Sequence, residues 1–289
     1  MALSSRKETY LIFFVIACII ILMLLKMLLE LGLSSLNESA SANAVILGII
    51  TRSFIIFGAI IFICKFSLKK INGFENKIRF SNPRAIIIPV LLGIVVILSN
   101  INQYKAATSE TLSLSVIVAL LIGFSEELTM RGIILPLMIK SSRKVISSVI
   151  FSSVIFGLMH YINIFKYNNI EWINGQVLSG FCMGVFFSGL FLRTGNIIVI
   201  AILHGFYNFA LGWNLLLEGN ICELLAADTP DNNWLSITLA LIIHGIIIIS
   251  GLLMVKWSDK QKILEKTNAT LSSFMIGSLN PNPERSPRS

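Results

Sequence analysis

Two adjacent glutamates and an arginine lie within an otherwise apolar stretch, LIGFSEELTMRGIILP. A charge inside a membrane costs about 2.5–3.5 kcal/mol on insertion scales, so such groups usually face a cavity or a partner. Glu127 and Arg131 are four residues apart, share one face of a helix and can pair. Glu126 is rotated by about 100° from Glu127, which leaves its carboxylate free for chemistry. Taken alone, the pattern equally fits a buried ion pair beside one protonated carboxylate.

All three histidines of the chain fall in or at the end of apolar stretches. Phe156 lies one turn before His160, and Asn208 lies one turn after His204 on the same face. Two imidazoles, a free carboxylate and an amide can together activate water and stabilise an oxyanion. His244 has no polar neighbour one turn away, so we expect it to be a satisfied core residue.

The elements that must position these residues are membrane spans. Hydrophobic residues make up 55% of the 289, charged residues only 13%, and the mean hydropathy is +0.82. A soluble domain carries about 25% charged residues, so much of this surface must face lipid. We predict an all-α, polytopic integral membrane helical bundle of about eight transmembrane helices, which excludes a cytosolic enzyme or a secreted disulfide scaffold. The predicted spans are roughly 10–30, 43–64, 85–101, 112–138, 145–162, 176–192, 196–213 and 234–256.

Lysine and arginine are distributed unevenly over the loops between these spans. Eighteen of the 23 fall in one set of alternate loops and two in the other. By the positive-inside rule, both termini lie in the cytoplasm of a multi-pass cell-membrane protein. The net charge of +8 then suggests basic loops at an anionic lipid leaflet, more than nucleic-acid binding. Arg52, about nine residues into the second span, should line the bundle interior or reach an acidic partner.

Three patterns occur in order on separate predicted spans: EExxxR from Glu126, FxxxH ending at His160, and HxxxN starting at His204. This set resembles the CAAX protease and bacteriocin-processing (CPBP, or Abi) family of intramembrane endopeptidases. That family includes the type II CAAX prenyl endopeptidase of eukaryotes. The resemblance runs from about Ile117 to Leu211, roughly a third of the chain, and includes the turn sequence RTGN.

The resemblance implies a role for each matching residue. Glu126 resembles the family's general base, and His160 resembles its partner in holding the attacking water. His204 and Asn208 resemble the pair that stabilises the oxyanion. We expect one polar cavity to gather these four residues, between the middle of the membrane and its outer face. Either the span that holds His160 continues past Tyr161, or the site tilts outward.

Glu127 and Arg131 look like the family's supporting ion pair. Whether a metal takes part is left open. Family members are commonly labelled metalloproteases, yet a direct glutamate–histidine mechanism has also been put forward. The HExxH pattern is absent from the chain. Zn²⁺ could be held by His160, His204 and Glu126 with an open fourth position, and the same residues also suffice without metal.

The resemblance implies an intramembrane endopeptidase that hydrolyses a peptide bond of a membrane-associated peptide or protein. The alternative is a non-proteolytic membrane immunity or regulatory protein that binds a sensor or peptide. A transporter ranks last, because no broken helices recur in corresponding halves of the chain. The four cysteines form no CxxC pair and indicate neither a disulfide framework nor a thiolate metal site.

We divide the chain into four parts. Residues 1–111 form the first three membrane helices, and residues 112–213 form the catalytic helices four to seven. Residues 214–256 form an outer loop and the eighth helix, and residues 257–289 form a basic cytoplasmic tail whose end is too polar to fold alone.

Overall fold

The computed structural model describes residues 2–34, 40–66, 68, 84–99, 101–142, 144–165, 169–212 and 234–258. All regular elements in these residues are helices, as the sequence predicts. They are α1 (Ala2–Ser34), α2 (Ala40–Lys65), α3 (Arg84–Ser99), α4 (Ile101–Ala106), α5 (Ser109–Thr129), the π-helical η1 (Met130–Ile134), α6 (Leu135–Ser142), α7 (Val145–Met159), the 3₁₀-helical η2 (His160–Phe165), α8 (Ile170–Thr194), α9 (Ile197–Gly212) and α12 (Trp234–Trp257).

The apolar helices confirm a polytopic membrane bundle. Among the described residues, four segments are long and apolar enough to cross a bilayer: Val45–Lys65, Ser109–Ser142, Val145–Phe165 and Ile170–Thr194. Four shorter apolar helices fall within or overlap the remaining predicted spans, at Thr9–Leu25, Ala85–Ser99, Ile197–Leu211 and Leu241–Lys256. Large apolar side chains stay exposed along these helices, as a lipid-facing surface requires.

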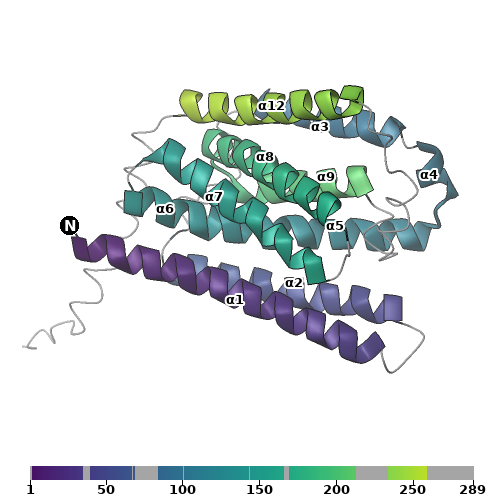
Figure 1. The fold of residues 1–289 in the computed structure, drawn as a ribbon, viewed down its shortest axis with the longest axis horizontal. Coiled ribbons are helices and arrows are strands. Elements are labelled where there is room, and N and C mark those ends of the chain that lie inside the picture. The colour runs from purple at the N-terminus through teal and green to yellow at the C-terminus, as the bar shows by residue number, and fades with distance from the viewer. Residues whose placement is uncertain are drawn as a thin grey trace, which may run out of the picture.

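The helices lie roughly along one common direction (Figure 1). α1 and α2 form one side of the bundle, and α3 and α12 lie on the opposite side. α5, α7, α8 and α9 fill the space between them. The helices that carry the motif residues are therefore the central ones, where polar groups are shielded from lipid.

Glycines let the central helices touch backbone to backbone. A Cβ on Gly123 of α5 would lie 2.6 Å from the amide nitrogen of Gly205 in α9. Likewise, a Cβ on Gly157 of α7 would lie 2.7 Å from the carbonyl oxygen of Val177 in α8. The first contact lies one turn from Glu127, so the glycine pair brings the carboxylates of α5 against α9.

A tight turn joins α8 to α9 and fixes where α9 begins. Gly195 ends α8 in the left-handed region at φ 67°, which glycine adopts without strain. The side-chain oxygen of Asn196 then accepts hydrogen bonds from the amides of Ile198, at 3.0 Å, and Val199, at 3.3 Å. This cap satisfies donors that the first turn of a helix leaves unpaired. It sets the start of α9 two turns before His204.

The predicted fourth span is interrupted by one π-helical turn between α5 and α6. The amide of Leu135 donates to the carbonyl of Met130, five residues back, where an α-helix would bond four residues back. All five residues of η1 are buried. The sequence predicted a continuous helix here, since a single wider turn leaves the apolar pattern almost unchanged.

Some predictions lie outside the described residues. They include the outer loop at 213–233, with Cys222, and the tail beyond Ser258. The side of the membrane on which each terminus lies, and the division into four parts, stay predictions.

Candidate active site

Glu127 is the hub of a buried polar network. Its side chain is fully buried on α5, and its Oε1 accepts hydrogen bonds from Arg131 Nη1 at 2.8 Å and from His204 Nδ1 at 2.7 Å. The first contact is the i, i+4 ion pair that the sequence predicts. The second contact joins residues 77 positions apart, and helical spacing does not specify which of the two carboxylates His204 meets. Glu127 therefore orients a histidine as well as neutralising an arginine.

Arg131 is held on every side. Besides Glu127, its guanidinium donates from Nη2 to the Gly184 carbonyl at 3.0 Å and from Nε to the Ser188 hydroxyl at 3.3 Å. Its Cζ lies 4.8 Å from the ring centroid of Phe156. A buried cation with this set of partners is a fixed structural charge, because each of its three nitrogens already donates a hydrogen bond.

His204 presents one ring nitrogen to the second carboxylate. Because the ionised Glu127 can only accept at Nδ1, Nε2 is the nitrogen left for chemistry. That atom lies 3.7 Å from Glu126 Oε2, too far for a direct hydrogen bond. The imidazole is 6% exposed and stacks on Phe187 with ring centroids 4.8 Å apart. Both contacts fix the ring plane.

His160 is oriented in a similar way from α7. Its Nδ1 lies 2.9 Å from the carbonyl oxygen of Phe156, which can only accept, so Nδ1 carries the proton and Nε2 is free to act as a base. Gly180 makes room for the ring, since a Cβ there would lie 3.0 Å from it. The Phe156 ring lies edge-on to both histidines, with centroids 5.1 Å from His160 and 6.2 Å from His204. The FxxxH phenylalanine thus packs against both imidazoles.

Glu126 is the less constrained of the two glutamates, as the helical spacing predicts. Its side chain is 23% exposed, against 0% for Glu127. Its Oε1 lies 3.8 Å from Nη1 of Arg52, which extends from α2 and also donates to Ser125 Oγ at 3.3 Å. The expectation that Arg52 reaches an acidic partner is confirmed.

A cavity of about 850 Å³ opens beside Glu126. Its polar lining includes Glu126, His160, Arg52 and Asn163, and apolar side chains of α1 and η2 form much of the rest. His204 and Asn208 do not line it, so the expectation of one cavity holding all four residues is wrong. His204 instead lies next to Glu126, with Nε2 of the imidazole 3.7 Å from Oε2 of the carboxylate. It comes from α9, which packs against α5, the helix that carries both glutamates.

The span that carries His160 does run past Tyr161. α7 ends at Met159, and η2 continues the segment as a 3₁₀-helix to Phe165. This was one of the two alternatives that the sequence left open. The change of helix type turns the residues after His160 toward the cavity, where Asn163 and Phe165 form part of its wall.

Asn208 carries an unused donor. Its Nδ2 is buried and has no hydrogen-bond partner in the described part of the chain. A buried amide donor without a partner costs about 1–3 kcal/mol. This amide lies one turn beyond His204 on α9 and does not line the cavity.

The three residues proposed as zinc ligands do not converge into a metal site. Among the described residues, no three histidine, cysteine, aspartate or glutamate side chains are placed to hold a metal ion. His204 Nδ1 is engaged by Glu127 and His160 Nδ1 by a backbone carbonyl. These contacts leave Nε2 of each ring free, as in metal-binding histidines, so it is the placement of the three side chains that does not fit a tetrahedral zinc centre, and no step below depends on one.

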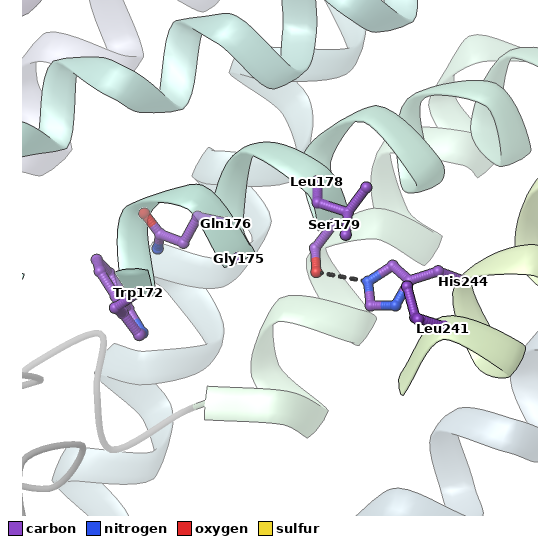
Figure 2. A pocket seen from close by; sticks show the side chains of 7 residues that line it. All are labelled: Trp172, Gly175, Gln176, Leu178, Ser179, Leu241 and His244. Atoms are coloured by element: carbon purple, nitrogen blue, oxygen red, sulfur yellow. Dashed lines mark hydrogen bonds between the residues drawn. The ribbon is translucent and has the colours of Figure 1, made fainter. Parts of the chain in front are cut away.

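His244 belongs to a separate hollow between α8 and α12 (Figure 2). Its Nε2 lies 2.9 Å from the hydroxyl of Ser179, at the side of a mostly apolar hollow of about 480 Å³ near Trp172. As predicted, the imidazole has a hydrogen-bond partner, but it is half-buried at the side of the hollow and is not a core residue. It lies apart from the motif residues, none of which lines this hollow.

The comparison with known protein families matches the central helices. Residues 108–210 match the family described as Type II CAAX prenyl endopeptidase Rce1-like. The matched stretch begins at the cap of α5, ends within α9 and includes Glu126, His160, His204 and Asn208. No curated protein and no solved structure matches the chain. The resemblance drawn from the three motifs is thereby confirmed at the level of the family. This chain is a membrane protein whose residues 108–210 are similar to the Rce1-like family of CAAX-type proteases.

Proposed function

We propose that this protein is an intramembrane endopeptidase that hydrolyses a membrane-associated peptide or protein with water activated by Glu126. One observation carries the proposal. The more exposed carboxylate and the His160 imidazole line one cavity, while the buried Glu127 orients a second imidazole toward that carboxylate. Hydrolysis needs a base that can reach water and a fixed donor close to it.

In the reaction, a water molecule lies beside Glu126 with one hydrogen toward the carboxylate and the other toward Nε2 of His160. Glu126 takes the first proton as the water oxygen attacks the carbonyl carbon. The protonated Glu126 then gives that proton to the leaving amine, and the C–N bond breaks. The net change is one peptide bond and one water converted to an acid and an amine.

The negative charge on the carbonyl oxygen needs donors placed in advance. His204 supplies one from Nε2 as an imidazolium, whose Nδ1–H is bonded to the Glu127 carboxylate. The unpartnered Nδ2 of Asn208 supplies the second. Arg131 takes no direct part and holds Glu127 in place.

The test compares Glu126→Gln with the wild-type protein. The glutamine keeps shape but cannot accept the proton, so hydrolysis should be lost while expression and unfolding are unchanged. Cells that lack the chain are complemented with each form, and new peptide termini are measured by mass spectrometry. An uncut precursor should accumulate with Glu126→Gln. Glu171→Gln is the matched control, since Glu171 is exposed at the start of α8.

Two results would count against the proposal. Near-wild-type turnover by purified Glu126→Gln would show that Glu126 is not the general base. Full rescue of the cells by a folded but hydrolytically inert variant would favour the regulatory alternative, in which the polar network is structural.

A further inference from the structure

Arg52 faces the cavity with most of its hydrogen-bonding capacity unused. A guanidinium has five N–H donors. Within the described residues, Arg52 makes one hydrogen bond, from Nη1 to Ser125 Oγ at 3.3 Å. Its approach to Glu126 Oε1, at 3.8 Å, is longer than a hydrogen bond. The side chain keeps 21% of its surface exposed and lines the cavity from the middle of α2.

The two arginines of the site differ in this respect. Arg131 is 1% exposed and is bonded at 2.8 Å to its carboxylate, whereas Arg52 is loosely paired and open to the cavity. In the proposed reaction Glu126 becomes neutral when it takes a proton from water. Arg52 would then be a cation without a counter-ion in apolar surroundings, unless the substrate supplies an anion.

The walls of the cavity restrict what that anion can be attached to. One side is formed by apolar residues of α1: Ile16, Ile19, Ile20, Met23 and Leu24. The volume, about 850 Å³, is in the range that encloses a ligand the size of a short peptide segment. A singly charged, planar carboxylate matches the guanidinium fork. A doubly charged phosphate would be opposed by the Glu126 carboxylate and by the apolar wall.

We propose that Arg52 is the binding site for a carboxylate of the substrate, next to the bond that is cleaved. The enzyme would then act on apolar peptide segments that carry a carboxylate close to the cleavage point. That carboxylate is either the C-terminus of the substrate or an acidic side chain. This inference rests on the proposed function, and it adds a specificity residue from α2, outside the matched region 108–210.

The experiment measures binding, so that it does not depend on hydrolysis. The protein is placed in nanodiscs of uncharged phosphatidylcholine. The probe is a short leucine–alanine peptide, N-methylated to resist cleavage and labelled with a fluorophore. It is made with a free C-terminal carboxylate, with a C-terminal amide, and as the amide with a glutamate next to the end. Fluorescence anisotropy gives the dissociation constant of each form.

The wild-type protein should bind the carboxylate form about 10- to 100-fold more tightly than the amide, the range expected for hydrogen bonds to a charged group. Arg52→Gln should abolish that preference while the amide form binds as before, and Arg52→Lys should keep part of it. Lys65→Gln removes an exposed positive charge from the same helix and should keep all of it. The glutamate probe identifies the source: tight binding points to a side chain, weak binding to the C-terminus.

Equal affinity of the wild-type protein for the carboxylate and amide forms would overturn the proposal, whatever the variants do. So would a preference that survives Arg52→Gln. If Glu126→Gln still hydrolyses substrate but the carboxylate preference depends on Arg52, the mechanism fails and the binding site stands. If hydrolysis needs Glu126 but the carboxylate preference is absent, the proposed mechanism stands and the Arg52 binding site fails.

Discussion

Replacing Glu127 by glutamine should destabilise the protein far more than the same change at Glu126. Both hydrogen bonds to Glu127 fall on Oε1, and Oε2 has no partner in the described residues. A glutamine can therefore keep both bonds through its carbonyl oxygen. The change removes the negative charge, puts an amide nitrogen at the unpartnered Oε2 position and leaves Arg131 as a buried cation, 1% exposed. The perturbation therefore acts mainly on the electrostatic part of the network.

Breaking a buried ion pair by removing one partner costs about 3–5 kcal/mol. Because the hydrogen bonds are kept, we expect Glu127→Gln to lower the free energy of unfolding by about 3 kcal/mol, near the lower end of this range. Glu127→Ala should lower it by an amount near the upper end. Combining Glu127→Gln with Arg131→Met removes both charges and should recover more than about 1 kcal/mol relative to Glu127→Gln alone. The free energy of unfolding is measured by SDS titration in mixed micelles, followed by tryptophan fluorescence.

Glu171→Gln is the control for the chemical change itself. Glu171 is exposed in the first turn of α8, so its loss should cost no more than about 1 kcal/mol through the helix dipole. A Glu127→Gln protein whose free energy of unfolding is within about 0.5 kcal/mol of wild type would refute the reasoning, because a buried cation without a counter-ion should destabilise the fold by more than that. A double variant no more stable than Glu127→Gln would show that the two charges are not coupled.

Three further outcomes are expected. Asn208→Ala should lower kcat by about 10²–10³ with little change in KM, because an oxyanion donor acts in the transition state; an unchanged kcat would remove Asn208 from the site. Gly180→Ala places a methyl group 3.0 Å from the His160 ring and should lower kcat about tenfold, whereas Gly175→Ala, which enters open space, should not. Reporter fusions at the C-terminus and within residues 214–233 should give opposite readouts, and matching readouts would reject the eight-span topology.

The sequence predicted the helices well because each depends on its own composition. Apolar runs of sufficient length gave the spans, and the i, i+4 rule gave the Glu127–Arg131 pair and the separate direction of Glu126. Missed elements were short and had no periodic signal of their own. They are the helix α4, the 3₁₀-helical η2 and the π-helical η1.

The arrangement of the site was harder to predict, for a physical reason. Helical spacing tells which side chains share a face, but not which other helix that face meets. The bond from His204 to Glu127 depends on α5 and α9 lying in contact, which follows from Gly123 meeting Gly205. Small residues on both helices were the available signal, and Gly205 directly follows the histidine. The exclusion of His204 and Asn208 from the cavity lining follows from the same contact.

The π-helical turn at Met130–Ile134 changes the direction in which side chains point along one continuous helical segment, α5 to α6. An additional residue in one turn rotates everything after it by about 100° relative to a regular α-helix. The carboxylates of α5 can therefore face α9 and the cavity, while the buried face of α6 packs against α1. Deleting one residue of this turn would restore a uniform α-helix, but it would rotate that face of α6 away from α1. Local helical regularity is given up here so that two halves of one helix can serve different neighbours.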